Sequence, residues 1–457
     1  MTTSGIAPSP RALRKGAELD LAFTDLLANG QGVGRADGIV VFCFGPLPGE
    51  VARVRITQVK ARYAVAEQLA ILRESPERAR PFCPVFGACG GCQLQHLDYA
   101  AQLRWKRDVV RAALARIGGH ERVDVRETIG LQQPRAYRNK MALVVDRRAT
   151  PAALGFYRQR SHEVVPIDAC PIVAPRLDEA LGRLNAARRD EPVSAMLTDA
   201  RHLVARSSAA AQQSVLTITS AHRSESAQQA APLLMREIAG LAGVSNSFDL
   251  SSANAIVGKR ERVLAGEPQI EETIGGLRYR FSAQSFFQVN VEMVARIFEY
   301  LAPRLTPPRR IVDLYSGVGT FSLLFARHGW NVVGVEENAR AVAEANENAR
   351  RNGLDRAARF MAGRIEQLTA EPDFLEALRS ADVVFLDPPR KGCDERTLGA
   401  LADARVRTLW YLSCDPATLA RDSKFLTAKG YHLGTVAPFD MFPQTGHVET
   451  LAELEYR

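Results

Sequence analysis

Cys414 is the side chain of this 457-residue sequence that is best placed for covalent chemistry. It lies in the segment Ser413–Pro416, directly after the apolar run Thr408–Leu412, which predicts a buried strand. A thiol where such a strand ends can act as a nucleophile, because ligands of α/β proteins bind at that edge of the sheet. A lone cysteine is more often an inert core thiol. The residues around Cys414 favour the nucleophile.

Glu449 supplies a carboxylate 35 residues after Cys414. A nucleophile that has added to a carbon atom must be eliminated again, and a base that removes a proton makes this possible. Together with a cofactor turn upstream, these two residues predict methyl transfer to a carbon atom.

Residues 312–321 predict a cofactor site, because they run from an apolar strand through Gly317 and Gly319 into a helix. The glycines let the backbone approach a ligand, and the helix N-terminus adds a positive dipole. Glu336 ends the next apolar strand, 19 residues after Gly317, where a carboxylate can bind ribose hydroxyls. Ser322 replaces the third glycine of the dinucleotide pattern, so the turn favours S-adenosylmethionine over NAD.

Asp387 follows the apolar run Val383–Leu386 and begins an Asp-Pro-Pro-Arg motif. A rigid surface turn would not need an acid directly after four apolar residues. We therefore expect Asp387 at the same sheet edge as the cofactor turn.

Three of the seven cysteines lie in one glycine-rich loop, and a fourth follows at a distance. Cys83, Cys89 and Cys92 have x5 and x2 spacing, and Cys170 could supply a fourth thiolate. Four thiolates suit a [4Fe–4S] cluster or a zinc site, and the spacing alone does not separate these. An odd cysteine count argues against a disulfide framework.

The elements that position these groups alternate as strand and helix after residue 281, which predicts a doubly wound, mainly parallel sheet. The predicted strands are 311–314, 332–336, 359–362, 383–386, 408–412, 432–437 and 449–456, and two predicted helices are 320–327 and 339–351.

The residues before the catalytic part predict two further domains. Strands at 20–26, 38–44, 50–57 and 63–72, with turns at Gly30, Gly32, Gly34 and Gly45, predict a small β-barrel. Such a barrel often binds oligonucleotides, although a purely structural β-domain fits equally well. Segment 75–95 is too irregular for a core element, and helical spacing covers 97–117 up to Gly118 and Gly119. Segment 126–271 mixes strands, such as 215–219, with helices, such as 227–241. We predict domains at 15–75, 76–271 and 272–457, with helix 97–117 packed on the last.

Composition favours a polyanionic partner, since the net charge is +8. Between Arg135 and Arg160 seven basic residues face one acid, with Tyr137, Phe156 and Tyr157 interleaved. Cations beside aromatic rings are what single-stranded RNA binding uses, and a solvated basic face is an equal alternative. No stretch approaches a membrane span, and residues 1–17 lack the apolar core of a secretory signal. We expect a cytoplasmic monomer.

These motifs in this order resemble the SAM-dependent RNA (uracil-5-)-methyltransferases that act on ribosomal and transfer RNA. The resemblance covers nearly the whole chain and is closest to the 23S ribosomal RNA type that carries a [4Fe–4S] cluster. It rests on a TRAM-type barrel at 17–74, the four cysteines, and the motifs at 137–140, 155–158, 285–290, 312–321, 387–390, 413–416 and 442–449.

The resemblance implies a multidomain α/β chain with an N-terminal TRAM-like barrel, a central α+β domain with an iron–sulfur loop, and a Rossmann-like class I methyltransferase domain. It implies that Cys414 is the nucleophile and Glu449 the base. The residues implied for the SAM and target-base pocket are Gln288, Tyr315, Gly317, Thr320, Glu336 and Asp387. Cys83, Cys89, Cys92 and Cys170 are implied as the [4Fe–4S] ligands.

The expected substrate is a uridine of ribosomal RNA, with transfer RNA as the alternative. One competing interpretation is an RNA cytosine-5-methyltransferase, whose second active-site cysteine would be Cys393, six residues after Asp387. Another is an iron–sulfur RNA-binding protein with a vestigial enzyme domain. A radical-SAM enzyme is disfavoured because its cysteines are usually spaced x3-x2.

Overall fold

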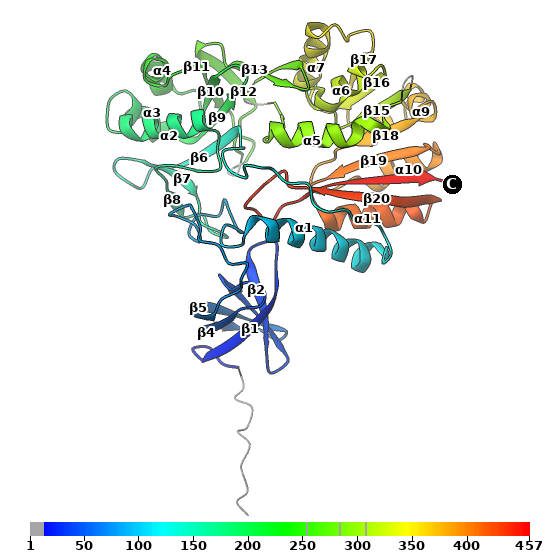
Figure 1. Cartoon of the computed structure of the whole chain (residues 1–457). Coiled ribbons are helices and arrows are strands. Elements are labelled where there is room, and N and C mark those ends of the chain that lie inside the picture. The colour runs from blue at the N-terminus through cyan, green and yellow to red at the C-terminus, as the bar shows by residue number, and fades with distance from the viewer. Residues whose placement is uncertain (1–12, 253–254, 283–284, 307–308) are drawn as a thin grey trace, which may run out of the picture. The chain divides into compact units, whose positions relative to one another are not determined.

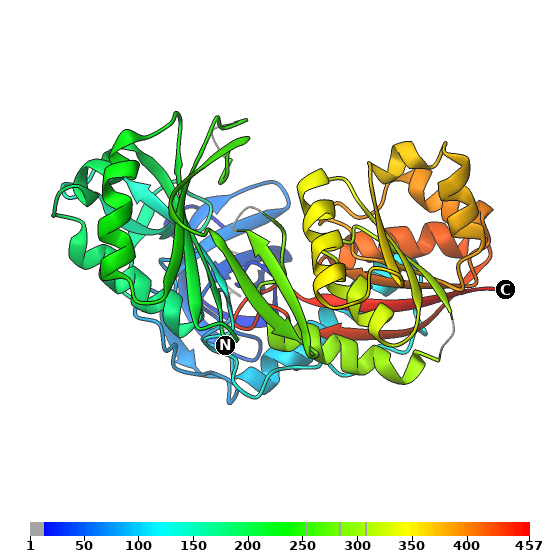
Figure 2. The same cartoon turned by 90° about the horizontal axis from the view of Figure 1, so that it is seen from above.

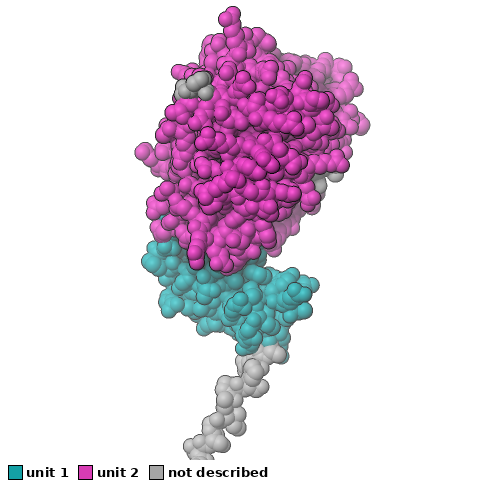
Figure 3. Space-filling model, turned by 90° about the vertical axis from the view of Figure 1, so that its right-hand side faces the viewer, with its two compact units in different colours: residues 1–102, 444–446 teal, residues 103–443, 447–457 magenta. Residues whose placement is uncertain are grey.

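The computed structural model describes residues 13–252, 255–282, 285–306 and 309–457. The chain divides into two compact units, coloured teal and magenta in Figure 3. Within the described residues, unit 1 comprises 13–102 and 444–446, and unit 2 comprises 103–443 and 447–457. The boundary falls within helix α1 (Tyr99–Ala113), which occupies much of the span predicted as helical.

Unit 1 contains a closed five-stranded β-barrel in the order β1-β2-β3-β5-β4, so the predicted barrel is confirmed. Successive side chains of a strand point to opposite faces, and alternate residues such as Leu21, Phe23 and Val54 therefore form the barrel core. Its strands are β1 (Glu18–Leu26), β2 (Gln31–Ala36), β3 (Ile39–Phe44), β4 (Val51–Val59) and β5 (Tyr63–Arg73).

Two of the predicted turn glycines lie in a strand that sequence reasoning missed. Gly32 and Gly34 belong to β2, whereas Gly30 and Gly45 do lie outside the strands with positive φ. A Cβ at Gly32 would come within 2.4 Å of the Pro46 carbonyl oxygen. The turn prediction for Gly32 and Gly34 was therefore wrong, because these glycines allow close packing inside the barrel rather than a change of direction.

The cysteine-rich segment after the barrel has no helix or strand between Arg73 and Tyr99, as predicted. It is tied to the barrel through the buried carboxylate of Glu50, which accepts a hydrogen bond from Arg78 Nη2 at 2.7 Å. The backbone amide of Ser75 donates to the same carboxylate at 3.1 Å. The loop is irregular but anchored.

Unit 2 holds two seven-stranded sheets, which Figure 2 shows as separate groups of strands, green for one and yellow to red for the other. The first, here called the central sheet, has the order β12-β11-β10-β9-β6-β7-β8. Its strands are β6 (Lys140–Asp146), β7 (Ala153–Tyr157), β8 (Val164–Pro166), β9 (Ala200–Ser208), β10 (Gln213–Ser220), β11 (Leu241–Phe248) and β12 (Arg260–Gly266). Its helices are α2 (Pro175–Ala187), α3 (Val193–Asp199) and α4 (Glu225–Glu237).

Strands β10 and β11 are parallel, because α4 returns the chain between them. The predicted strand 215–219 is confirmed as part of β10. The predicted helix 227–241 extends too far, since α4 ends at Glu237 and Leu241 already begins β11. A hairpin of β13 (Gln269–Ile274) and β14 (Leu277–Ser282) follows this sheet in the chain.

The second sheet, here called the catalytic sheet, has the order β17-β16-β15-β18-β19-β21-β20 and confirms all seven predicted strands (Figure 1). Six strands run in the same direction, and β21, between β19 and β20, is antiparallel to both neighbours. The strands are β15 (Arg310–Leu314), β16 (Asn331–Glu336), β17 (Ala358–Ala362), β18 (Val383–Leu386), β19 (Thr408–Ser413), β20 (Tyr431–Phe439) and β21 (Glu449–Tyr456).

The two faces of the catalytic sheet are covered by different helices. Trp410 and Leu412 join a core with α5, α6 and α7, while Leu409 and Tyr411 join a core with α8 to α11. Val110 and Leu114, in α1 and the π-helical turn Leu114–Gly118 after it, join the second core. The helices are α5 (Val291–Leu301), α6 (Thr320–Arg327), α7 (Ala339–Arg351), α8 (Ile365–Leu368), α9 (Pro372–Arg379), α10 (Glu395–Asp403) and α11 (Pro416–Thr427), and Ala302–Arg304 forms a 3-10 turn.

Across the described ranges, no helix combines the length and apolar character that a membrane span requires.

Candidate functional site

The glycine turn after β15 is shaped for close approach of a ligand. Gly317 and Gly319 both have positive φ, at 55° and 84°, and Gly319 is the cap of α6. A Cβ at Gly319 would meet the Phe360 ring at 2.9 Å. Thr320, the first residue of α6, is buried, and its carbonyl accepts a hydrogen bond from Tyr279 Oη at 2.9 Å. The turn therefore has its predicted backbone form and leads directly into the N-terminus of α6.

Glu336 faces this turn from the end of β16. Its Oε2 accepts a hydrogen bond from the Gly317 amide at 3.1 Å, and its Oε1 accepts one from the Asn338 amide at 2.8 Å. The two predicted residues are thus brought together at the carboxyl edge of the catalytic sheet.

Asp313 is a buried carboxyl directly beneath the turn. Burial raises its pKa to about 7, partly offset by the hydrogen bond that the Ser322 hydroxyl donates to it. This explains the serine at the third glycine position of the motif, because Ser322 supplies a partner that glycine cannot.

Asp387 and Gln288 meet at the end of β18. Gln288 Nε2 donates a hydrogen bond to Asp387 Oδ2 at 3.1 Å, and burial raises the pKa of Asp387 to about 7. The Gln288 carbonyl in turn accepts from Asn139 Nδ2 at 3.0 Å. The residue directly before β6 thereby holds the loop that carries Gln288.

Strand register brings Cys414 and Glu449 together. Ser413 pairs with Thr450 in the antiparallel β19–β21 ladder, so the next step of that register joins 414 to 449. Cys414 is half-buried, and burial followed by the charges of Glu449 and Asp387 raises its pKa to about 12. Burial, then the charge of Asp387, raises the pKa of Glu449 well above its ordinary value. Oε1 of Glu449 is buried without a hydrogen-bond partner among the described residues.

Arg390 is a site residue that sequence reasoning quoted in a motif but assigned no role. Its positive charge opposes the rise in pKa of both Cys414 and Glu449. Its Nη2 lies 3.1 Å from His447 Nε2, which must then be unprotonated to accept the hydrogen bond. A cation beside these two acidic groups stabilises whichever of them is ionised.

Phe286 is a second such residue. Its side chain is 64% exposed although it lies two residues before Gln288, and its ring is 3.9 Å from the position of a Cβ on Gly317. An exposed ring between the cofactor turn and Gln288 is available for stacking on a base.

A buried polar group, here called the Asp422 clamp, holds the loop after Asp387. Oδ2 of Asp422 accepts hydrogen bonds from the Cys393 amide at 2.9 Å and from Tyr411 Oη at 2.6 Å. Arg421 bridges Asp422 to the Lys391 carbonyl. Tyr315, predicted in the pocket, directs its hydroxyl to Cys393 Sγ at 3.8 Å, and burial raises the pKa of that thiol to about 12.

The three loop cysteines lie in unit 1, and Cys170 lies in unit 2. Sγ of Cys89 accepts a hydrogen bond from the Gly91 amide at 3.4 Å, and burial raises the pKa of this thiol. Among the described residues, no three Cys, His, Asp or Glu side chains are grouped as metal ligands. The thiol chemistry of these residues suits a thiolate-bound group.

The basic segment 135–160 is partly neutralised by one acid of its own and one that follows it. Arg148 pairs with Asp146 at 2.8 Å, and Arg158 pairs with Glu163 at 3.0 Å. Burial, then the charges of Arg206 and Arg138, lowers the pKa of Lys140 to about 7. The segment is therefore less cationic than its composition indicates.

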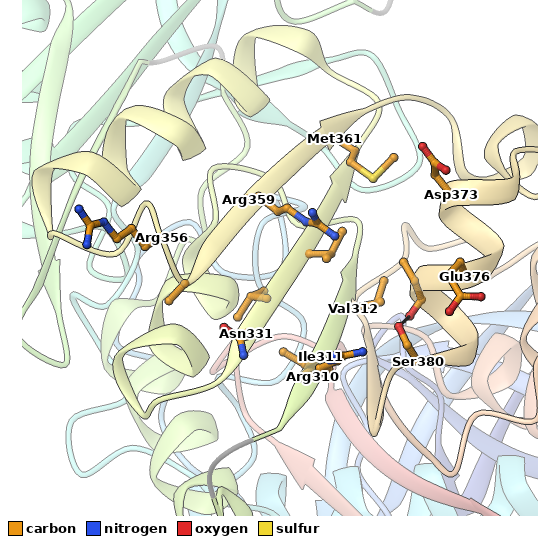
Figure 4. Close-up of a pocket in the computed structure, with 14 residues that line it drawn as sticks. Arg310, Ile311, Val312, Asn331, Arg356, Arg359, Met361, Asp373, Glu376 and Ser380 are labelled. Atoms are coloured by element: carbon orange, nitrogen blue, oxygen red, sulfur yellow. Dashed lines mark hydrogen bonds between the residues drawn. The ribbon is translucent and has the colours of Figure 1, made fainter.

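A cavity of about 740 Å³ lies away from these groups (Figure 4). It is lined by the first residues of β15 and β16, by Arg359 and Met361 of β17, and by Asp373 and Glu376 of α9. Arg310 and Asn331 begin their strands, whereas the predicted cofactor residues follow the opposite ends. This cavity is therefore distinct from the cofactor turn.

Two protein families match the chain. Residues 98–457 match the tRNA (uracil-5-)-methyltransferase family, and residues 12–69 match the TRAM domain.

Relatives of similar length share a third or more of their residues with the chain. An uncharacterized RNA methyltransferase of Gloeobacter violaceus is 39% identical over 98% of each chain. One of Clostridium acetobutylicum is 34% identical over 96% of this chain and 97% of its own. The crystal structure of the Pyrococcus abyssi tRNA (uracil-54, C5)-methyltransferase with S-adenosyl-L-homocysteine has a TM-score of 0.75 and 26% identity, over 95% of this chain and 99% of that one.

Proposed function

The chain belongs to the tRNA (uracil-5-)-methyltransferase family and is a SAM-dependent RNA (uracil-5-)-methyltransferase; from this premise we propose that it methylates carbon 5 of a ribosomal RNA uridine through a covalent bond to Cys414. The observation that carries the proposed mechanism is the meeting of Cys414, Glu449 and Asp387 beside Arg390. A thiol and a base on adjacent strands can act on one ring without moving.

Covalent addition solves a problem of reactivity. Carbon 5 of uracil is a poor nucleophile, whereas bond formation between Cys414 Sγ and carbon 6 makes carbon 5 enolate-like. The thiol proton is first lost to solvent, and Arg390 stabilises the thiolate. When bound, SAM supplies an electrophilic methyl group. Glu449 then removes the carbon 5 proton, and the electron pair of that bond re-forms the 5,6 double bond as the sulfur leaves.

The site also contains groups for recognising the base. Gln288 and Asp387 offer an amide and a carboxyl side by side, which can pair with the polar edge of uracil. Phe286 offers an exposed ring at the same place. We propose that Gly317, Thr320, Tyr315 and Glu336 bind the cofactor, with Glu336 on the ribose.

The reaction is tested by incubating the purified protein with SAM and unmodified ribosomal or transfer RNA, then mapping 5-methyluridine by nuclease digestion and mass spectrometry. One new 5-methyluridine in ribosomal RNA is the expected result. 5-Methylcytidine, or no product from SAM-bound protein, would overturn the proposal.

Transfer RNA is the second candidate substrate. The name of the matching family and the tRNA specificity of the Pyrococcus abyssi enzyme favour it. The cysteine loop and the barrel are our reasons for preferring ribosomal RNA. In the same experiment, product confined to transfer RNA would decide for the alternative.

We also propose that Cys83, Cys89, Cys92 and Cys170 bind a [4Fe–4S] cluster with a structural or RNA-docking role. Support comes from the thiol donor set and from the Gly91 amide on Cys89 Sγ, since hydrogen bonds to sulfur tune such clusters. Anaerobically purified protein should contain about four irons and show sulfur-to-iron charge-transfer absorption. Cys89→Ser should lose iron, whereas Cys43→Ala, in the barrel core, should keep it. Stoichiometric zinc without iron would contradict the cluster.

A further inference from the structure

A second cavity, of about 780 Å³, lies at the edge of the central sheet. β10 and β11 are parallel, so their carboxyl ends share one edge, and residues after each strand line the cavity. β9 and β12 run in the opposite direction and begin at this edge, bringing Arg201 and Arg260 to it. The carboxyl edge of a βαβ unit is where open α/β sheets place ligands.

Basic residues outnumber acidic ones in the lining of this cavity. Arg201, His222, Arg223 and Arg260 line it, and Asp249 is the one acid among its lining residues. Within the described ranges, neither Arg201 nor Arg260 pairs with a carboxylate. Arg223 pairs with Glu225 at 2.9 Å, but both side chains are more than half exposed, so the pair is weak and can exchange for a phosphate. Three guanidinium groups are thus available to an anion.

An aromatic ring accompanies these charges. The guanidinium carbon of Arg260 lies 5.3 Å from the centre of the Phe248 ring, and both residues line the cavity. Guanidinium groups beside a ring are suited to a nucleotide, because the cations bind phosphate and the planar groups stack on the base.

The strand that carries Arg260 is also joined to the catalytic part of unit 2. Glu261, the next residue of β12, accepts a hydrogen bond from Arg340 Nη1 at 2.7 Å. Arg340 belongs to the first turn of α7, which follows Glu336 in the chain. A phosphate held at Arg260 is therefore held on the frame that presents the cofactor turn.

We propose that this cavity, here called the arginine cavity, binds a nucleotide and its flanking phosphate in the substrate RNA, outside the target uridine. The inference rests on the proposed RNA substrate and extends it to a docking site. This docking site contributes affinity for the RNA and fixes its position on the protein, while the chemistry takes place at Cys414.

The test is an RNA filter-binding titration without SAM, at several salt concentrations, on unmodified ribosomal RNA. Arg201→Gln/Arg260→Gln should weaken affinity about 10-fold or more and reduce the slope of log K against log salt by about 1.4, the value for two single-strand phosphate contacts. Arg183→Gln/Arg189→Gln removes two exposed arginines at α2 of the same sheet and should change neither.

A charge-preserving variant guards against misfolding. Arg201→Lys/Arg260→Lys should retain most of the salt slope, and SAM affinity and melting temperature should match the parent in all three variants. Equal RNA affinity and slope for the two Gln variants would overturn the proposal, as would a Lys variant as weak as the first. Because binding is measured without turnover, these results are independent of whether 5-methyluridine is the product.

Discussion

Unit 2 presents residues for function at the carboxyl edges of parallel strands in two sheets, and the two edges differ in charge and burial. At the catalytic sheet the groups are Asp313, Glu336, Asp387 and Cys414, and three of the four have a raised pKa because they are buried. At the central sheet the groups are three arginines and a histidine, of which only Arg201 is partly buried.

Both sheets place these residues at the carboxyl edge of parallel strands, but one set suits chemistry and the other suits binding of a polyanion. Burial makes a carboxyl costly to ionise, so Asp313 and Asp387 exchange protons near neutral pH, which suits chemistry. Exposed arginines remain charged and bind a polyanion without being pre-arranged around it. Changes at the catalytic edge should therefore alter rate, and changes at the arginine cavity should alter affinity.

The largest expected effect is that of Cys414→Ala, which should abolish methylation, by about 10⁴-fold or more, since the covalent step is lost. The covalent adduct with 5-fluorouracil-substituted RNA should disappear on denaturing gels, while filter binding of RNA is unchanged. Cys393→Ala is the matched control and should still form the adduct. Adduct formation by Cys414→Ala would contradict the assignment of Cys414 as the nucleophile.

Glu449→Gln should slow turnover by about 10²–10⁴-fold, the range of a general base. The failure lies after methyl transfer, so a protein–RNA adduct should accumulate with natural RNA and SAM. Gel electrophoresis in denaturant detects it. Loss of turnover without any adduct would assign Glu449 to an earlier step.

Asp387→Asn should lower the rate by about 10²-fold by weakening base recognition, and it should also move the pH profile. Burial, then the like charge of Asp387, raises the pKa of Glu449. A base works only when ionised, so activity falls as pH falls through its pKa. Without Asp387 this acid limb should shift to lower pH in single-turnover rates. If the acid limb stays at the same pH, the charge of Asp387 does not influence the pKa of the group that acts as base.

Asp313→Asn tests how much a buried carboxyl at the catalytic edge changes the stability of the protein. The folded-state pKa of about 7 exceeds the ordinary value of 3.8, so the native state retains a proton that the unfolded state has lost. The contribution of Asp313 to the unfolding free energy of the wild type therefore falls as pH rises from 4 to 7. Relative to wild type, the free energy of unfolding of the variant, measured in urea, should rise by about 1–3 kcal/mol between pH 4 and pH 7. A difference between variant and wild type that does not change with pH would contradict this expectation.

The smallest effect is expected for Tyr411→Phe, which removes the hydrogen bond to Asp422 and a longer one from the Cys393 amide. Unfolding free energy should fall by about 1 kcal/mol, and the rate by less, because the Cys393 amide still binds Asp422. Thermal unfolding measures the first quantity. A loss of rate as large as that of Asp387→Asn would show that the Asp422 clamp is needed for catalysis and not only for stability.

Sequence reasoning succeeded where local pattern determines structure. Apolar runs identified every strand of the catalytic sheet, and the glycine spacing identified the turn at Gly317 and Gly319. It missed β2, because Gly32 and Gly34 have a role that only the packing of Pro46 and Ala22 reveals. It also missed Arg390 and Asp422, whose partners are distant in sequence, and the exposure of Phe286 has no local signature.

The insertion of β21 between β19 and β20 has a consequence for biosynthesis. Because β21 is made after both neighbours, a nascent chain cannot join β19 to β20 until the last-made of the three strands emerges from the ribosome. The same strand begins with Glu449, so the fold is completed and the residue proposed as the base is added at the same stage of synthesis. A chain interrupted before residue 449 would expose two strand edges and carry a thiol with no base, which makes prematurely terminated products candidates for aggregation rather than for errant modification of RNA.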